Sequence, residues 1–93
     1  MDEKQISDMY LAAAILSYGG VLVGIDRKDA RKQKFRFSGE GIPEIYVVDN
    51  GNMIRIVSPT LEIVETKFVS QSLYFPPTYP DALRRIKSAI HAE

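Results

Sequence analysis

Residues 21–37, VLVGIDRKDARKQKFRF, contain the pattern that decides the fold. Apolar residues alternate along the first third of this stretch and again at Phe35 and Phe37, as side chains on one face of a β-strand do. The apolar face of the first strand is predicted to hold Val21, Val23 and Ile25. The second strand has one aromatic and one cationic face, so the whole stretch is predicted to be a β-hairpin.

The loop and second strand of this hairpin are densely basic. Half of the chain's twelve lysines and arginines lie here, namely Arg27, Lys28, Arg31, Lys32, Lys34 and Arg36. A two-stranded ribbon fits the major groove of DNA, and its cations can contact phosphates. The same charges could bind an acidic protein surface, or could only keep an exposed hairpin from aggregating. These six residues are the candidate polyanion-binding site, and all three interpretations stay open.

Composition limits the class of protein. The 93 residues suffice for one domain, residues 1–93, and the 45% hydrophobic content suits a folded chain. A net charge of zero argues against a protein that coats nucleic acid, but not against a local basic patch. The charged start MDEKQ is unlike a signal peptide, and the apolar run 9–16 is too short to cross a bilayer. We therefore expect a soluble, cytoplasmic protein with no membrane partner.

Residues 6–18 are predicted to form a helix. Ser7 can cap its start, and Gly19 with Gly20 can supply the left-handed residue that ends it. Nearly every face of this helix is apolar, so it must be buried on more than one side or meet a partner. Packing against a sheet is the main expectation, and a homodimer seam is the alternative.

Asn50-Gly51 indicates a second hairpin. This dipeptide is the preferred centre of a type I′ turn, because both of its residues adopt positive φ. With these two residues as the loop, the predicted pairing runs from Asp49–Asn52 to Ile45–Ile56.

Residues directly opposite each other share a face of the hairpin. One face is predicted to be core and holds Ile45, Val47, Ile54 and Ile56. The other face is half apolar and holds Tyr46, Val48, Met53 and Arg55. Three short helices cannot cover both this face and the apolar first helix. Tyr46, Val48 and Met53 are therefore predicted to mediate self-association, for which a homodimer is the commonest form.

The C-terminal third is predicted to be helical. Ser58-Pro59 resembles a helix start, and the spacing of apolar residues favours a helix to about Ser72, with a fifth strand as the alternative. Three prolines within 73–80 indicate a turn. Pro80 then opens a last helix whose inner stripe is Leu83, Ile86 and Ile90. The sum is a two-layer α+β domain, in which a four-stranded antiparallel meander packs against an N-terminal helix and two C-terminal helices.

The sequence offers little catalytic chemistry. Cysteine is absent, which excludes disulfides and thiolate chemistry, and the one histidine, His91, lies near the end of the chain. We therefore expect no enzyme, no catalytic residue, no metal site and no cofactor. Tyr10, Tyr46 and Tyr74 could stack on bases. The expected function is a small binding or assembly module that binds nucleic acid through the basic hairpin. The alternative is a homodimeric structural or accessory protein without a nucleic-acid role.

Residues 7–37 also resemble a known family. The resemblance rests on the stretch 7–13 (SDMYLAA), Gly19, the stretch 22–27 (LVGIDR), Asp29, Arg31 and Phe35-Arg36-Phe37. It is to small proteins of bacteria, archaea and their phages, classed as a domain of unknown function. Members share a D-x-Y-L-A-A-x-L-x-x-G helix, a strand that ends in a charged pair, and F-x-F. The resemblance implies a prokaryotic or phage setting. It implies no activity and no catalytic residue.

Overall fold

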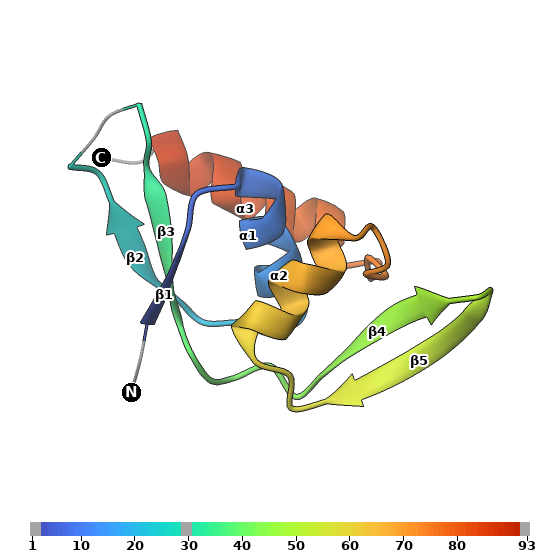
Figure 1. The fold of residues 1–93 in the computed structure, drawn as a ribbon. Coiled ribbons are helices and arrows are strands. Elements are labelled where there is room, and N and C mark those ends of the chain that lie inside the picture. Colours follow the sequence, from blue (N-terminus) through green and yellow to red (C-terminus); the bar gives the residue numbers. More distant parts are fainter. Residues whose placement is uncertain (1–2, 29–30, 92–93) are drawn as a thin grey trace.

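The computed structural model describes residues 3–28 and 31–91, and these form three helices and five strands in an α+β fold (Figure 1). In chain order the elements are β1 (Glu3–Ile6), α1 (Met9–Ser17), β2 (Leu22–Asp26), β3 (Lys34–Ser38), β4 (Glu44–Asp49), β5 (Asn52–Val57), α2 (Leu61–Val69) and α3 (Tyr79–His91). None of the helices in this part of the chain is long and apolar enough to cross a membrane.

The strands make two separate antiparallel sheets, so the predicted four-stranded meander is wrong. One sheet has the order β1-β3-β2 and the other consists of β4 and β5. Both predicted hairpins form, but they do not pair with each other, because β1 occupies the free edge of β3. The outer edge of β4 is hydrogen-bonded to residues 72–74. The Val48 N–H donates to Ser72 O (2.8 Å), and the Tyr74 N–H donates to Tyr46 O (2.9 Å).

Helix α1 is shorter than predicted. Ile6 belongs to β1, and Asp8 rather than Ser7 caps the helix, its carboxylate accepting from the N–H groups of Tyr10 (2.8 Å) and Leu11 (3.2 Å). The helix ends as predicted, with Gly19 at φ 99°. Residues 11–15 are buried, and α1 packs against α3, α2 and β1. The other helices and the sheet thus cover its apolar faces.

The β2–β3 hairpin contains a bulge that the alternation did not reveal. The pairing register shifts between Leu22 and Gly24. Leu22 and Ile25 therefore lie opposite Phe37 and Phe35 on the core side, and Val23 is turned outward. The predicted apolar face of Val21, Val23 and Ile25 is wrong for its first two residues, which are exposed.

The β4–β5 hairpin has the predicted register, from Asp49–Asn52 to Ile45–Ile56. Its turn residues Asn50 and Gly51 have φ 52° and 79°. Ile45 and Val47 are buried as predicted, but Ile54 is 42% exposed. The reason is visible in Figure 1, where the hairpin extends beyond the helices at one end of the molecule.

The C-terminal helices form with shifted boundaries. Thr60, not Ser58, caps α2, and the helix stops at Val69 rather than Ser72. The alternative of a strand over 60–72 is wrong, since Leu61–Val69 is helical; beyond the helix, Leu73 makes an isolated β-bridge to Val47. In α3, Ile86 is buried and its neighbours on the inner stripe, Leu83 and Ile90, are half-buried, as predicted.

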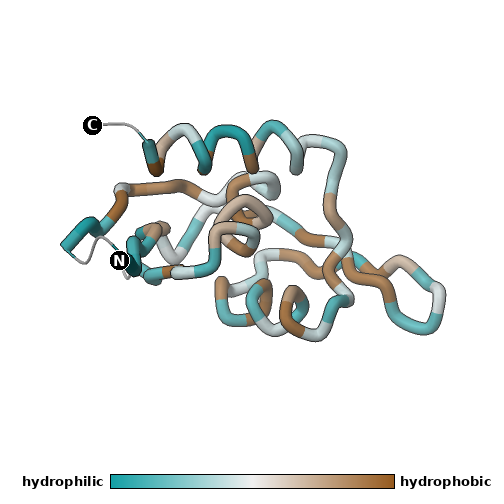
Figure 2. Tube along the Cα trace, turned by 90° about the horizontal axis from the view of Figure 1, so that it is seen from above, coloured by the Kyte–Doolittle hydropathy of each residue, from teal (hydrophilic) through white to brown (hydrophobic). Residues whose placement is uncertain are grey.

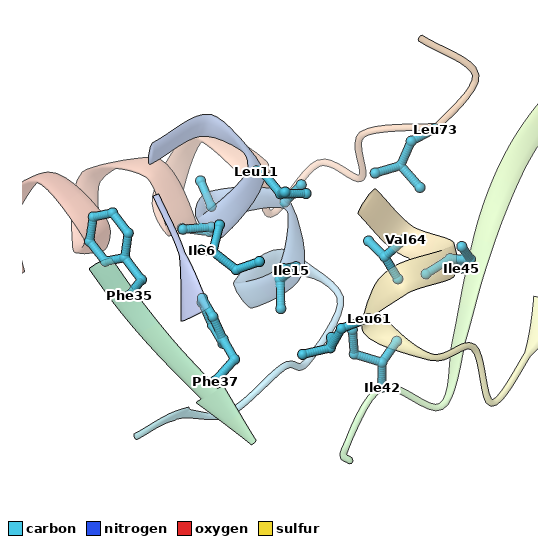
Figure 3. Packing of buried hydrophobic residues seen from close by; sticks show 14 of the residues in the cluster. Ile6, Leu11, Ile15, Phe35, Phe37, Ile42, Ile45, Leu61, Val64 and Leu73 are labelled. Atoms are coloured by element: carbon cyan, nitrogen blue, oxygen red, sulfur yellow. The ribbon is translucent and has the colours of Figure 1, made fainter. Parts of the chain in front are cut away.

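A single hydrophobic cluster joins the two sheets. Around Phe35 and Phe37 it fills the space between the first sheet and α1, and around Ile45 and Val64 it fills the space between β4 and α2 (Figure 3). Ile15 of α1 lies between these two groups. The chain outside this cluster is mostly hydrophilic, as the loops in Figure 2 show.

Candidate polyanion-binding site

Two buried phenylalanines determine which face of the basic hairpin is exposed. Phe35 and Phe37 are almost completely buried against the helices. Because side chains alternate across a strand, Lys34 and Arg36 must project from the opposite, uncovered face of the sheet. The hairpin end, with the loop that follows β2, lies at one extremity of the molecule (Figures 1 and 2).

Two of the six candidate cations are engaged within the fold. Arg27 donates from its guanidinium to the carbonyl oxygens of Ala89 and Ile90 (3.0 Å to the latter), at the C-terminal end of α3. Carbonyls at that end are otherwise unpaired and carry partial negative charge, which a guanidinium offsets. Arg27 therefore attaches the β2–β3 loop to α3.

Arg36 forms a two-point ion pair with Glu3 of β1, with distances of 2.9 Å and 3.1 Å. The hydrogen bond to this carboxylate raises the pKa of Arg36 further above its ordinary value. Neither Arg27 nor Arg36 is available for a phosphate without loss of its contact.

Three lysines gather at a shared hollow beside the loop. Lys28, Lys32 and Lys34, together with Asp26, line a depression of about 220 Å³. All three lysines are exposed, and none of them joins an ion pair in residues 3–28 and 31–91. Asp26 lies opposite Lys34 in the sheet and accepts from the backbone N–H of Lys28 (3.0 Å), which fixes the start of the loop. The group keeps a net positive charge.

Arg31 belongs to an adjoining and larger hollow. Arg31, Lys32 and Lys34 are among the residues that line this space of about 680 Å³, as are Ser7 and Met9 near the start of α1. Asp29 and Ala30, between Lys28 and Arg31, lie outside the described residues. Four of the six predicted cations are thus brought together around two neighbouring depressions, and two are not.

The predicted self-association residues lie at the other end of the molecule. Val48 and Met53 are directly opposite each other in the hairpin and are both exposed. Tyr46 is half-buried instead, and its hydroxyl donates to Glu44 (2.8 Å). Tyr46 and Tyr74 lie together beside this second sheet, so they are not placed to stack on bases held by the basic loop.

The carboxylates are dispersed. No three His, Cys, Asp or Glu side chains of the described residues are grouped so that they could hold a metal ion. His91 is exposed at the end of α3.

Comparison with known proteins gives no further assignment. No protein-family model, no curated protein and no solved structure matches this chain. The resemblance of residues 7–37 to a small prokaryotic family, with its phage setting, stays a prediction, as does a cytoplasmic location.

Proposed function

We propose that this chain is a small, non-enzymatic nucleic-acid-binding module that contacts phosphates through Lys28, Arg31, Lys32 and Lys34. The observation that carries the proposal is the shared hollow of Lys28, Lys32 and Lys34 at the projecting end of the β2–β3 hairpin. Ammonium groups are point charges that bind phosphate without demanding a fixed geometry. Binding is therefore expected to be electrostatic and largely independent of sequence.

Two further features support the proposal. Arg27 ties the loop to α3, so the lysines are presented on a loop held at its base. Three basic residues outside the hairpin are paired with carboxylates: Lys4 with Glu62 and Glu65, Arg55 with Glu44, and Arg84 with Asp81. Lys28, Lys32 and Lys34, by contrast, join no ion pair within residues 3–28 and 31–91.

The test is fluorescence anisotropy with labelled single- and double-stranded DNA and RNA, titrated at low and physiological salt. The double variant Lys32→Glu/Lys34→Glu should lose binding at least about tenfold, because two phosphate contacts are replaced by repulsion. The slope of log affinity against log salt should fall by about 2 for the duplex, since each phosphate contact releases roughly one counterion.

A matched control is available on α3. Arg85→Glu/Lys87→Glu makes the same change in net charge at exposed positions of another element. It should retain most of the binding. Equal loss in both variants would show that only net charge matters, and absence of binding at low salt would refute the proposal. Binding to an acidic protein but not to nucleic acid would assign the site to the alternative partner.

A further inference from the structure

The outer edge of β5 is an open strand edge. Within the described chain, β5 has a strand neighbour only on the side of β4. Asp49 and Asn52 close the two-residue turn as a hydrogen-bonded pair. The next pair along the strands is not hydrogen-bonded, and the two kinds of pair alternate from there. The N–H and C=O groups of Met53, Arg55 and Val57 therefore point away from β4. The same alternation on β4 is directly visible, because Tyr46 and Val48 bond outward to residues 72–74.

The other sheet shows how this chain protects an edge. The outer strand β1 is four residues long and mostly polar, and β2 is interrupted by its bulge. Short polar strands and bulges both discourage pairing with another chain. β5 has neither device: it is six residues long, NMIRIV, and contains no lysine or proline. Met53, Ile54 and Val57 are 54%, 42% and 60% exposed.

We propose that β5 pairs with β5 of a second copy of this chain, antiparallel about a two-fold axis at Arg55, so that two hairpins form one continuous four-stranded sheet. Met53 then lies opposite Val57 of the partner subunit and exchanges both backbone hydrogen bonds with it. Ile54 lies opposite Ile56 of the partner subunit on the other face. Every outward backbone group of 53–57 is satisfied, and the exposed residues Met53, Ile54 and Val57 each gain an apolar neighbour.

The chain's own residues favour this occupant and this register. Centring the axis one residue earlier, at Ile54, would place Met53 opposite Arg55 of the partner subunit and Ile56 opposite Asn52 of the partner subunit, which leaves Ile54 opposite its own copy as the one apolar pair among these residues. The register at Arg55 sets two arginines side by side, but each already has an ion pair with its own Glu44 (2.6 Å). The net charge of zero also means that two copies do not repel each other at long range.

The shape of the molecule permits the approach. The hairpin projects from the helices at one end of the long axis, which measures 42 Å (Figures 1 and 2). Isologous pairing of an exposed edge strand is a common way to build a dimer from such a hairpin.

A proline at position 55 tests the pairing between copies without disturbing the hydrogen bonds within the hairpin. The N–H of Arg55 points outward, so Arg55→Pro removes hydrogen bonds only from the proposed dimer. Arg55→Thr is the matched control, because it also removes the ion pair with Glu44 but keeps the N–H. Sedimentation equilibrium should show a concentration-dependent dimer for the wild type and for Arg55→Thr. For Arg55→Pro the dissociation constant should rise about tenfold or more.

Circular dichroism and a thermal melt of Arg55→Pro show whether this variant is folded. A wild type that stays monomeric at every concentration would overturn the proposal and leave the edge to a strand of another protein. An unchanged dimer in a folded Arg55→Pro would overturn it as well.

The register has an independent test that leaves every backbone hydrogen bond in place. The chain has no cysteine, so introduced thiols are the only ones present. Ile54→Cys/Ile56→Cys places each thiol opposite its counterpart at a non-hydrogen-bonded pair, where Cβ atoms are close enough for a disulfide. Oxidation should give covalent dimers for the double variant and far fewer for either single variant. Efficient cross-linking of Ile54→Cys alone would refute the register at Arg55.

Discussion

At the scale of single residues, Tyr18 connects three segments of the fold, which no sequence pattern predicted. Its hydroxyl lies between the carbonyl oxygens of Tyr46 (3.4 Å) and Tyr74 and the N–H of Tyr46 (3.4 Å). One side chain at the end of α1 thus holds β4 and the segment after α2 together. Burial raises the pKa of Tyr18 above its ordinary value.

Tyr18→Phe removes this hydroxyl and leaves the ring. The carbonyl of Tyr74 then loses this donor at an exposed position, and the backbone of Tyr46 loses its longer contacts at a part-buried one, so the free energy of unfolding should fall by about 0.5–1.5 kcal/mol. Urea unfolding measures the change. Tyr10→Phe is the control, because Tyr10 is 51% exposed and its hydroxyl bonds to no described residue.

The pH dependence distinguishes the hydroxyl from a general packing effect. A pKa raised in the folded state means that the folded chain keeps a proton that the unfolded chain releases. The stabilisation is complete below the unfolded pKa of tyrosine and is lost as pH rises through the folded pKa. Wild-type stability should therefore decline more steeply than that of Tyr18→Phe at alkaline pH. Parallel declines would show that the hydroxyl contributes nothing specific.

At the scale of elements, the end of α1 depends on a close approach of backbone. The N–H of Gly20 donates to Ile15 O (2.9 Å), and a Cβ at position 20 would lie 2.4 Å from Cγ2 of Ile15 and 2.8 Å from its carbonyl oxygen. Ile15 is fully buried between the two halves of the core, so it has little room to move.

Gly20→Ala should destabilise the protein by about 2–3 kcal/mol, the upper part of the range for overpacked sites. Gly51→Ala provides the comparison: nothing lies within 4 Å of its added Cβ, and only its φ of 79° is unfavourable. That strain costs about 1 kcal/mol. Thermal or urea unfolding of both variants tests the order, and a smaller loss at position 20 than at position 51 would contradict the steric explanation.

Local signals predicted the elements that depend only on neighbouring residues. The Asn50-Gly51 turn set the register of β4 and β5, and two phenylalanines set the inner face of β3. β1 was missed because its four residues are mostly polar and become a strand only by pairing with β3. The partners of two candidate cations were missed for the same reason: Arg36 pairs with Glu3 33 residues away, and Arg27 with Ile90 63 residues away.

At the scale of the whole molecule, the basic loop and the β4–β5 hairpin lie at opposite ends of the long axis (Figure 1). A dimer built through β5 would therefore carry its two basic loops at its far ends. One duplex that reaches both loops would be held twice, and the second contact would benefit from a high effective concentration. Together, the two proposals predict that the affinity of the protein for DNA depends on the length of the duplex.

We expect the wild type to bind a duplex of about 30 base pairs, roughly 100 Å long, at least about tenfold more tightly than one of about 10 base pairs. Arg55→Pro should lose most of this preference and keep only the gain from the larger number of sites on the longer duplex. It should bind the short duplex as the wild type does, because each of its basic loops remains intact. Anisotropy titrations with both duplexes, at protein concentrations above the wild-type dimer constant, make the measurement. Lys32→Glu/Lys34→Glu should weaken binding to both lengths without dissociating the dimer. If Arg55→Pro kept the full preference for the long duplex, the two basic loops would not be acting together.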